Sequence, residues 1–220
     1  MDWITHRWHR GLSIALCVLI VPGLGLVPSL LSGPADTTRE LKQLIDADQR
    51  EPLPPNLPTE PAARERVFRA YWEAHFKPRR DRALALVEGG QLSSPEDYEL
   101  AGTLLNHSLY ADDHLVAHLL FTIAARKGHE GARWESAAAL DNYLSAIGRP
   151  QLFGTLWGSP GRPDEDRSGV MGAPMADSLR REFCVPALPR QAALLDSLRQ
   201  GDVETWRRGK IDCGHGAVQP

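Results

Sequence analysis

An uncharged apolar segment near the start of the chain sets the first constraint on what this sequence can form. It runs from Leu12 to Leu31 as LSIALCVLIVPGLGLVPSLL, and Arg7 and Arg10 precede it. About 20 consecutive apolar residues match the thickness of the hydrocarbon core of a bilayer. Because basic residues beside such a segment stay on the cytoplasmic side, the rest of the chain is expected across a membrane from where it was made.

Two interpretations of residues 1–35 remain open. The length of the apolar run favours a retained single-span anchor, because the cores of signal peptides are shorter. The prolines and glycines at its far end, and the small residues around Ala35, favour a signal peptide that is cleaved near Ala35. The first predicts a single-pass membrane protein with its C-terminal domain outside the cytoplasm, and the second predicts a secreted protein.

Composition bounds what the exported part can be. The chain has 220 residues, and about 185 remain after the leader, which is enough for one domain with its own core. With 42% hydrophobic and 24% charged residues, this part is expected to be globular rather than disordered. The net charge of −3 and a pI of about 6.2 exclude nucleic acid as a partner, since no basic stripe is present to neutralise phosphates.

Helix signals dominate the sequence after the leader. Residues 36–61 are expected to form a helix and a proline-rich spacer, since EPLPPNLPTEP fits neither a helix interior nor a central strand. Residues 62–220 are expected to form an α-helical globular domain with a loop-rich C-terminal part. We therefore predict a mainly α fold, an irregular bundle of about six to eight helices, because alternating strand patterns are scarce.

Three capping patterns mark expected helix starts. Residues 37–40 (TTRE) have the spacing of a capping box, and residues 94–97 (SPED) add a proline at the first helical position. Asp112 or Asp113 is expected to cap the helix that follows.

One stretch is typical of a helical hairpin. Between Ala117 and Trp134 the sequence reads AHLLFTIAARKGHEGARW, in which two alanine-rich helices meet at Gly128. This pattern resembles a single unit of a Sel1-like or TPR-like repeat. Since a solenoid needs several stacked units, the pattern predicts one local hairpin and no repeat array.

A wider resemblance covers residues 38–190. The segments LIDADQR at 44–50, SPEDY at 94–98, NH at 106–107 and GRPQLFGT at 148–155 resemble a bacterial domain family of unknown function. Because that family has no assigned activity, the resemblance implies a fold unit and no reaction. Two positions depart from it: Asn142 stands where members usually have Arg, and Leu156 stands where they usually have Gln. A ligand bound there by relatives is therefore not carried over to this chain.

The cysteines indicate one candidate cross-link. Cys17 lies in the leader, which leaves Cys184 and Cys213 as the pair in the exported part. In an oxidising compartment two such thiols are a candidate disulfide. The alternative is two unrelated thiols, since sequence alone does not bring their Cα atoms together.

Four polar residues beside apolar helical patterns form a catalytic candidate. In this interpretation His107 is a general base, Asp48 or Asp141 is the carboxylate that orients it, and Gln151 supplies an amide that holds substrate. The alternative is a buried hydrogen-bond network that fixes how the helices pack.

One pair of histidines has the spacing of metal ligands. His114 and His118 are four residues apart and share one helical face, but neither a neighbouring Glu nor a third ligand accompanies them. The alternative is a histidine at a helix start and a half-buried histidine. The sequence contains no nucleophile elbow, no Walker loop and no dinucleotide fingerprint outside the leader, so no cofactor is predicted.

These observations predict a binding or interaction module of a bacterial envelope, attached to the membrane through Leu12 to Leu31, with a possible protein partner. The alternative is an envelope hydrolase with a His/carboxylate polar pocket. An enzyme is expected to gather His107, Asp48, Asp141 and Gln151 around an open cleft. A binding module is expected to seal them and expose an apolar patch.

Overall fold

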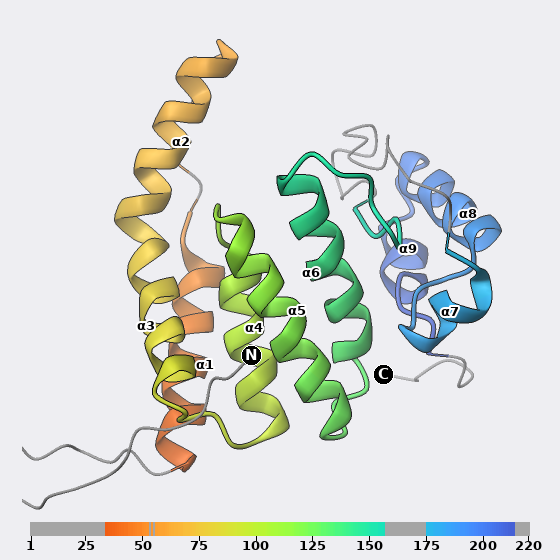
Figure 1. Ribbon diagram of the computed structural model, residues 1–220. Helices are drawn as coiled ribbons and strands as arrows, with labels where there is room; N and C mark the ends of the chain where they lie inside the picture. Colours follow the sequence, from red (N-terminus) through yellow and green to blue (C-terminus); the bar gives the residue numbers. More distant parts are fainter. Residues whose placement is uncertain (1–33, 53, 55, 157–174, 214–220) are drawn as a thin grey trace, which may run out of the picture. The chain divides into compact units, whose positions relative to one another are not determined.

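The computed structural model describes residues 34–52, 54, 56–156 and 175–213. The described helices, shown in Figure 1, are α1 (Pro34–Arg50), α2 (Pro61–His75), α3 (Lys77–Glu88), α4 (Pro95–Asn106), α5 (Ala111–Arg126), α6 (Ala132–Ala146), α7 (Asp177–Glu182), α8 (Leu188–Arg199) and α9 (Val203–Gly209). No β-strand occurs in these residues, so the predicted mainly α fold is confirmed, with nine described helices instead of six to eight.

The apolar run from Leu12 to Leu31 lies outside the described residues. Within the part of the chain that the structure does describe, none of the helices combines the length and apolar character that a bilayer span requires.

The predicted start of α4 is confirmed in detail. The Ser94 hydroxyl accepts a hydrogen bond from the Asp97 backbone N–H at 3.1 Å, and the Asp97 carboxylate accepts one from the Ser94 N–H at 2.9 Å. This reciprocal pair satisfies backbone donors that the first helical turn leaves without partners. The Thr38 hydroxyl donates to the same carboxylate at 2.5 Å, so the cap also holds α1 against α4.

Two other predicted caps are wrong. The first helix begins at Pro34, and Thr37 lies inside it with a buried hydroxyl that has no hydrogen-bond partner among the described residues. The fifth helix begins at Ala111, with no side-chain cap. The Asp113 carboxylate is instead paired with Arg80 of α3, whose Nε lies 2.6 Å away. The Asp113 side chain therefore forms an ion pair with α3 and does not cap α5.

The main hydrophobic core lies between α1, α3, α4, α5 and α6. Leu41 of α1 is fully buried in it, so the segment that the sequence set apart as residues 36–61 contributes directly to the helical domain. Gly102 of α4 faces the ring of Phe121 of α5, where an added Cβ would lie 3.0 Å from the ring atom Cε1. Glycine therefore allows these two helices to approach closely. The buried members of this core are Leu41, Ala83, Leu86, Leu92, Ala101, Leu104, Leu105, Ala117, Leu120, Phe121, Ala124, Ala132 and Ala139.

The predicted helical hairpin is present as α5 and α6, which lie side by side and run in opposite directions (Figure 1). Gly128 turns the chain between them with a φ of +105°, a conformation that favours glycine. Small buried residues of α6, Ala132, Ser136 and Ala139, allow close packing. The hydroxyls of Thr122 and Ser136 lie 2.9 Å apart across the pair.

The C-terminal part forms a second, smaller cluster around Phe153, Val185 and Ala137 of α6. A disulfide joins Cys184 to Cys213, the pairing that the sequence suggested, and it closes a segment with a separation of 29 residues. Helix α9 was not predicted, although Asp202 supplied a signal. Its carboxylate accepts a hydrogen bond from the Thr205 N–H at 3.0 Å and so caps α9.

Candidate functional site

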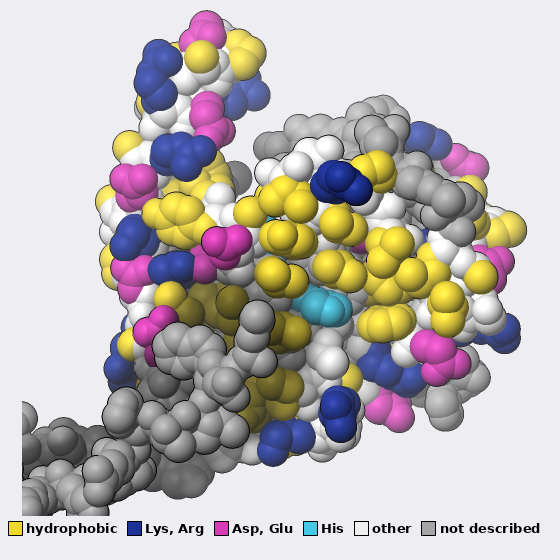
Figure 2. Space-filling view, viewed as in Figure 1, with side chains coloured by type: hydrophobic (Ala, Val, Ile, Leu, Met, Phe, Trp, Pro, Cys, Tyr) yellow, Lys and Arg dark blue, Asp and Glu magenta, His cyan; other side chains and the backbone are white. Residues whose placement is uncertain are grey.

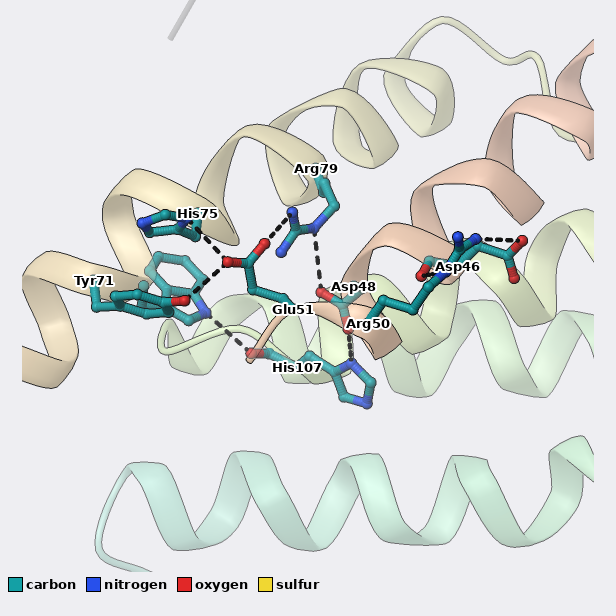
Figure 3. A network of polar contacts seen from close by, with 9 residues as sticks. Asp46, Asp48, Arg50, Glu51, Tyr71, His75, Arg79 and His107 are labelled. Carbon is teal, nitrogen blue, oxygen red and sulfur yellow. Dashed lines mark hydrogen bonds and ion pairs between the residues drawn. The ribbon is translucent and has the colours of Figure 1, made fainter. Parts of the chain in front are cut away.

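The structure brings together two of the four predicted catalytic residues, Asp48 and His107. Asp48 lies near the end of α1, and its side chain is 6% exposed, whereas the His107 side chain is 41% exposed. Their nearest atoms, Nδ1 of His107 and Oδ2 of Asp48, are 2.7 Å apart (Figure 3). If Nδ1 donates to this carboxylate, the basic nitrogen of the neutral ring is Nε2. A buried carboxylate that orients an exposed imidazole is an arrangement suited to general-base chemistry.

His107 is fixed through its backbone as well as its ring. It follows the last residue of α4, and its carbonyl oxygen accepts a hydrogen bond from the indole Nε1 of Trp72 at 3.3 Å. Trp72 is buried and meets the ring of Tyr110 edge-on, with ring centroids 5.4 Å apart. His107 is therefore held through its ring by Asp48 of α1 and through its backbone by Trp72 of α2.

A second carboxylate, that of Glu51, extends the network from Asp48 to α2 and α3 (Figure 3). It accepts a hydrogen bond from the Tyr71 hydroxyl at 2.9 Å and lies 3.0 Å from Nδ1 of His75. The hydrogen bond from Tyr71 is the main cause that lowers the pKa of Glu51, and burial opposes it. Burial, followed by this same hydrogen bond, raises the pKa of Tyr71.

Arg79 lies between the two carboxylates. Its Nε is 3.6 Å from Asp48, its Nη1 is 3.3 Å from Glu51, and its guanidinium lies over the ring of Phe76 at 4.9 Å. The Nε and Nη2 groups of Arg79 are buried without a hydrogen-bond partner among the described residues. One cation thus faces two anions in a half-buried setting. We refer to Asp48, Glu51, Arg79 and His107 below as the Asp48–His107 network.

Asp141 and Gln151, the other two predicted residues, belong to a different polar group. The fully buried carboxylate of Asp141 accepts hydrogen bonds from the backbone N–H groups of Leu152, Phe153 and Thr155 at 2.7, 3.0 and 2.8 Å. The Oε1 atom of Gln151 accepts one from the N–H of Leu156 at 2.9 Å. Both side chains therefore hold the loop that follows α6.

Arg180 completes this second group and was not identified from the sequence. Its guanidinium is fully buried and donates to the carbonyl oxygens of Pro186 and Phe153 and, at 2.6 Å, to Oε1 of Gln191. Burial lowers the pKa of Arg180. An arginine in a short charged helix carries no signal of burial, because arginines in such positions are usually exposed. The group is closed to solvent and has a structural role.

The two candidate metal ligands on α5 have separate environments. His114 is buried, and burial lowers its pKa. Nδ1 of His118 lies 2.9 Å from the carbonyl oxygen of Ser136 on α6. In the described part of the chain, no group of three or more His, Cys, Asp or Glu side chains is arranged to hold a metal ion.

Two glutamates with perturbed pKa values were also missed. Burial is the main cause that raises the pKa of Glu99 on α4 and of Glu135 on α6, and the charge of Glu99 adds to the effect at Glu135. The Thr103 hydroxyl lies 3.3 Å from Oε1 of Glu99. Their positions in sequence gave no indication that these two acidic side chains interact.

Comparison of this chain with protein-family models, with curated proteins and with solved structures finds no match.

Proposed function

We propose that this chain is an exported helical interaction module of a bacterial envelope. The observation that carries the proposal is an apolar stripe on α5 formed by Leu115, Leu119 and Ile123, which are 37%, 54% and 37% exposed. Residues four apart lie on one side of a helix, so the three side chains form a continuous surface, called here the α5 apolar face. Exposed apolar surfaces of this kind mark sites of contact with other molecules.

The surroundings of α5 extend this surface. Figure 2 shows hydrophobic side chains gathered on the face where α5 and α6 lie. The opposite side of α5, with Ala117, Leu120 and Phe121, is buried in the core. Folding has therefore used one apolar side of this helix and left the other available to a partner.

The arrangement of the polar residues agrees with a binding role. Asp141 and Gln151 are buried and paired with backbone groups of one loop, so they do not join Asp48 and His107 around a common cleft. A four-residue catalytic pocket is therefore not supported, whereas an exposed apolar surface is what we expect of a binding module.

Export is supported by two observations. Arg7 and Arg10 precede the apolar run from Leu12 to Leu31, which favours translocation of the C-terminal part. The Cys184–Cys213 disulfide also favours an oxidising compartment, because such bonds are rarely kept in the cytosol.

The export part of the proposal is tested with a phosphatase reporter fused after Pro220. This enzyme is active only outside the cytoplasm, so activity is expected in intact cells. Export would be contradicted by an inactive phosphatase fusion, if a second fusion at the same position, to a protein that fluoresces only in the cytoplasm, is fluorescent.

The interaction part is tested in cells with a photo-cross-linking residue at position 119. Leu179 of α7 is the matched control, because it is 52% exposed and outside the α5 apolar face. We expect a discrete cross-linked product from position 119 and none from position 179. Equal products from both positions, or none from either, would contradict an interaction role for this face.

A second candidate function is hydrolysis with His107 as the general base, which the 2.7 Å contact with Asp48 and the exposed imidazole favour. Hydrolysis of 4-nitrophenyl esters by the full chain is the test. His107→Gln should abolish activity and Asp48→Asn should lower it. His75→Gln, which alters the Asp48–His107 network only through its contact with Glu51, should have little effect. Equal rates for the wild type and His107→Gln would reject this candidate.

A further inference from the structure

The α5 apolar face has opposite charges at its two ends. Asp112 precedes Leu119 by seven residues, and Arg126 follows Leu119 by seven. Seven residues are about two turns of an α-helix, so both charged side chains lie on the same side of α5 as Leu119. Both residues are exposed, and within the described part of the chain neither side chain has an ion-pair or hydrogen-bond partner.

The apolar residues are arranged symmetrically about the same point. Leu115 lies four residues before Leu119 and Ile123 lies four residues after it, with equal exposed fractions of 37%. From either end of the face towards its centre, a charged residue is followed by a branched apolar residue and then by Leu119. The charge differs in sign between the two ends.

This pattern is complementary to itself when one copy is reversed. In an antiparallel pair of α5 helices related by a two-fold axis at Leu119, each residue faces the one equally far on the other side of position 119. Leu115 then faces Ile123 of the second copy, and Asp112 faces Arg126 of the second copy. Two-fold interfaces are built in this way, from one patch that matches itself. A parallel pair would instead place like charges together, which is unfavourable.

We propose that two copies of this chain associate through antiparallel α5 helices about a two-fold axis at Leu119. This inference rests on the proposed interaction role of the α5 apolar face and names its partner as a second copy of the chain. The contact consists of one pair of helices and is smaller than a standard stable interface, so association in the micromolar range is expected.

The test is disulfide cross-linking of the full chain in intact cells, with Cys17→Ser removing the cysteine of the leader. Leu119→Cys lies on the proposed axis and should form a dimer with itself under mild oxidation, whereas the equally exposed Leu179→Cys should not. Leu115→Cys should form little dimer alone and much more when co-expressed with Ile123→Cys. A dimer of Leu115→Cys with itself would indicate a parallel pair and would overturn the proposal.

Charge reversal distinguishes this antiparallel geometry from nonspecific hydrophobic association. Asp112→Arg alone should slow the cross-linking of Leu119→Cys by about tenfold, and Arg126→Asp alone should do the same, because each places two like-charged pairs in the dimer. The double variant restores opposite charges at both ends and should recover the original rate. Rates that do not respond to the single changes, or do not recover in the double variant, would overturn the proposal.

The outcome also distinguishes this inference from the broader function. If Leu119→Cys forms no more dimer than Leu179→Cys while the photo-cross-linker at position 119 captures a different protein, the second copy is the wrong partner and the interaction role stands. If position 119 yields no product in either experiment, both proposals fail.

Discussion

Removing the carboxylate of Asp141 should be among the most destabilising single changes in the described part of the chain. The side chain is fully buried and accepts four hydrogen bonds, from the N–H groups of Leu152, Phe153 and Thr155 and, at 2.8 Å, from the Thr155 hydroxyl. These bonds hold the loop from which Phe153 inserts into the C-terminal cluster. Loss of the carboxylate therefore affects both the polar group and the packing around it.

The magnitude follows from the donors that would be left without partners. Leu152 is 37% exposed, so its N–H can turn to water, whereas Phe153 and Thr155 are 2% and 6% exposed. Each buried unsatisfied donor costs about 1–3 kcal/mol. Two backbone donors and a hydroxyl that can rotate give a loss of about 3–5 kcal/mol for Asp141→Ala, a large part of the stability of a typical domain.

The assay is urea unfolding of the full chain in a mild detergent, followed by tryptophan fluorescence with the disulfide intact. Asp196→Ala is the matched control, since this carboxylate lies on the surface of α8 and pairs with Arg199 only three residues away. The control should change the free energy of unfolding by less than about 0.5 kcal/mol. Amide exchange at Phe153 and Thr155 should become faster in Asp141→Ala alone. A loss below about 1 kcal/mol, with unchanged exchange, would refute the role assigned to Asp141.

Three further outcomes are expected. Burial, and then the nearby charge of Glu99, raises the pKa of Glu135 above its usual value of 4.5. The contribution of Glu135 to stability is therefore fully present below pH 4.5 and is lost as the pH rises through the folded-state pKa. Glu135→Gln should raise Tm at pH 7.5 and leave it unchanged at pH 4, and equal Tm differences at both pH values would contradict this. Gly102→Ala should cost about 1–3 kcal/mol in urea unfolding, because its Cβ would lie 3.0 Å from the Phe121 ring, and the same change should cost less in a chain that already carries Phe121→Leu. Cys184→Ser with Cys213→Ser should lower the free energy of unfolding by about 3–4 kcal/mol, as expected for a bridge between residues 29 apart, and an unchanged midpoint in urea would show that the bond contributes nothing.

Local chemistry made several elements predictable. The SPED pattern at residues 94–97 starts α4 as expected, because both partners of the capping box lie within one turn of each other. Gly128 was also a local signal for the turn between α5 and α6, because glycine adopts the positive φ of this turn without help from distant residues. The capping of α9 by Asp202 was equally local and could have been found in the same way.

The cap prediction that failed for α5, and the choice of carboxylate that the sequence left open, both depended on distant partners. Asp113 was expected to cap α5, but Arg80 lies within reach only after α3 packs against the neighbouring helices, and the ion pair takes the carboxylate. Likewise, the choice between Asp48 and Asp141 as the partner of His107 could not be made from spacing. Asp48 lies 59 residues from His107 in the chain, and Asp141 pairs with a loop that only the C-terminal packing brings to it.

The sequence by itself determined the helical character of this protein, the capped start of α4, the glycine turn between α5 and α6, and the two cysteines available for a cross-link, because each depends on residues within a turn or on composition. Only the tertiary structure decided that His107 meets Asp48, that Arg180 is buried, and that Leu115, Leu119 and Ile123 remain on the surface. The reason is that a helical pattern shows which residues share a side of a helix, whereas the side that becomes buried depends on which other helices pack against it.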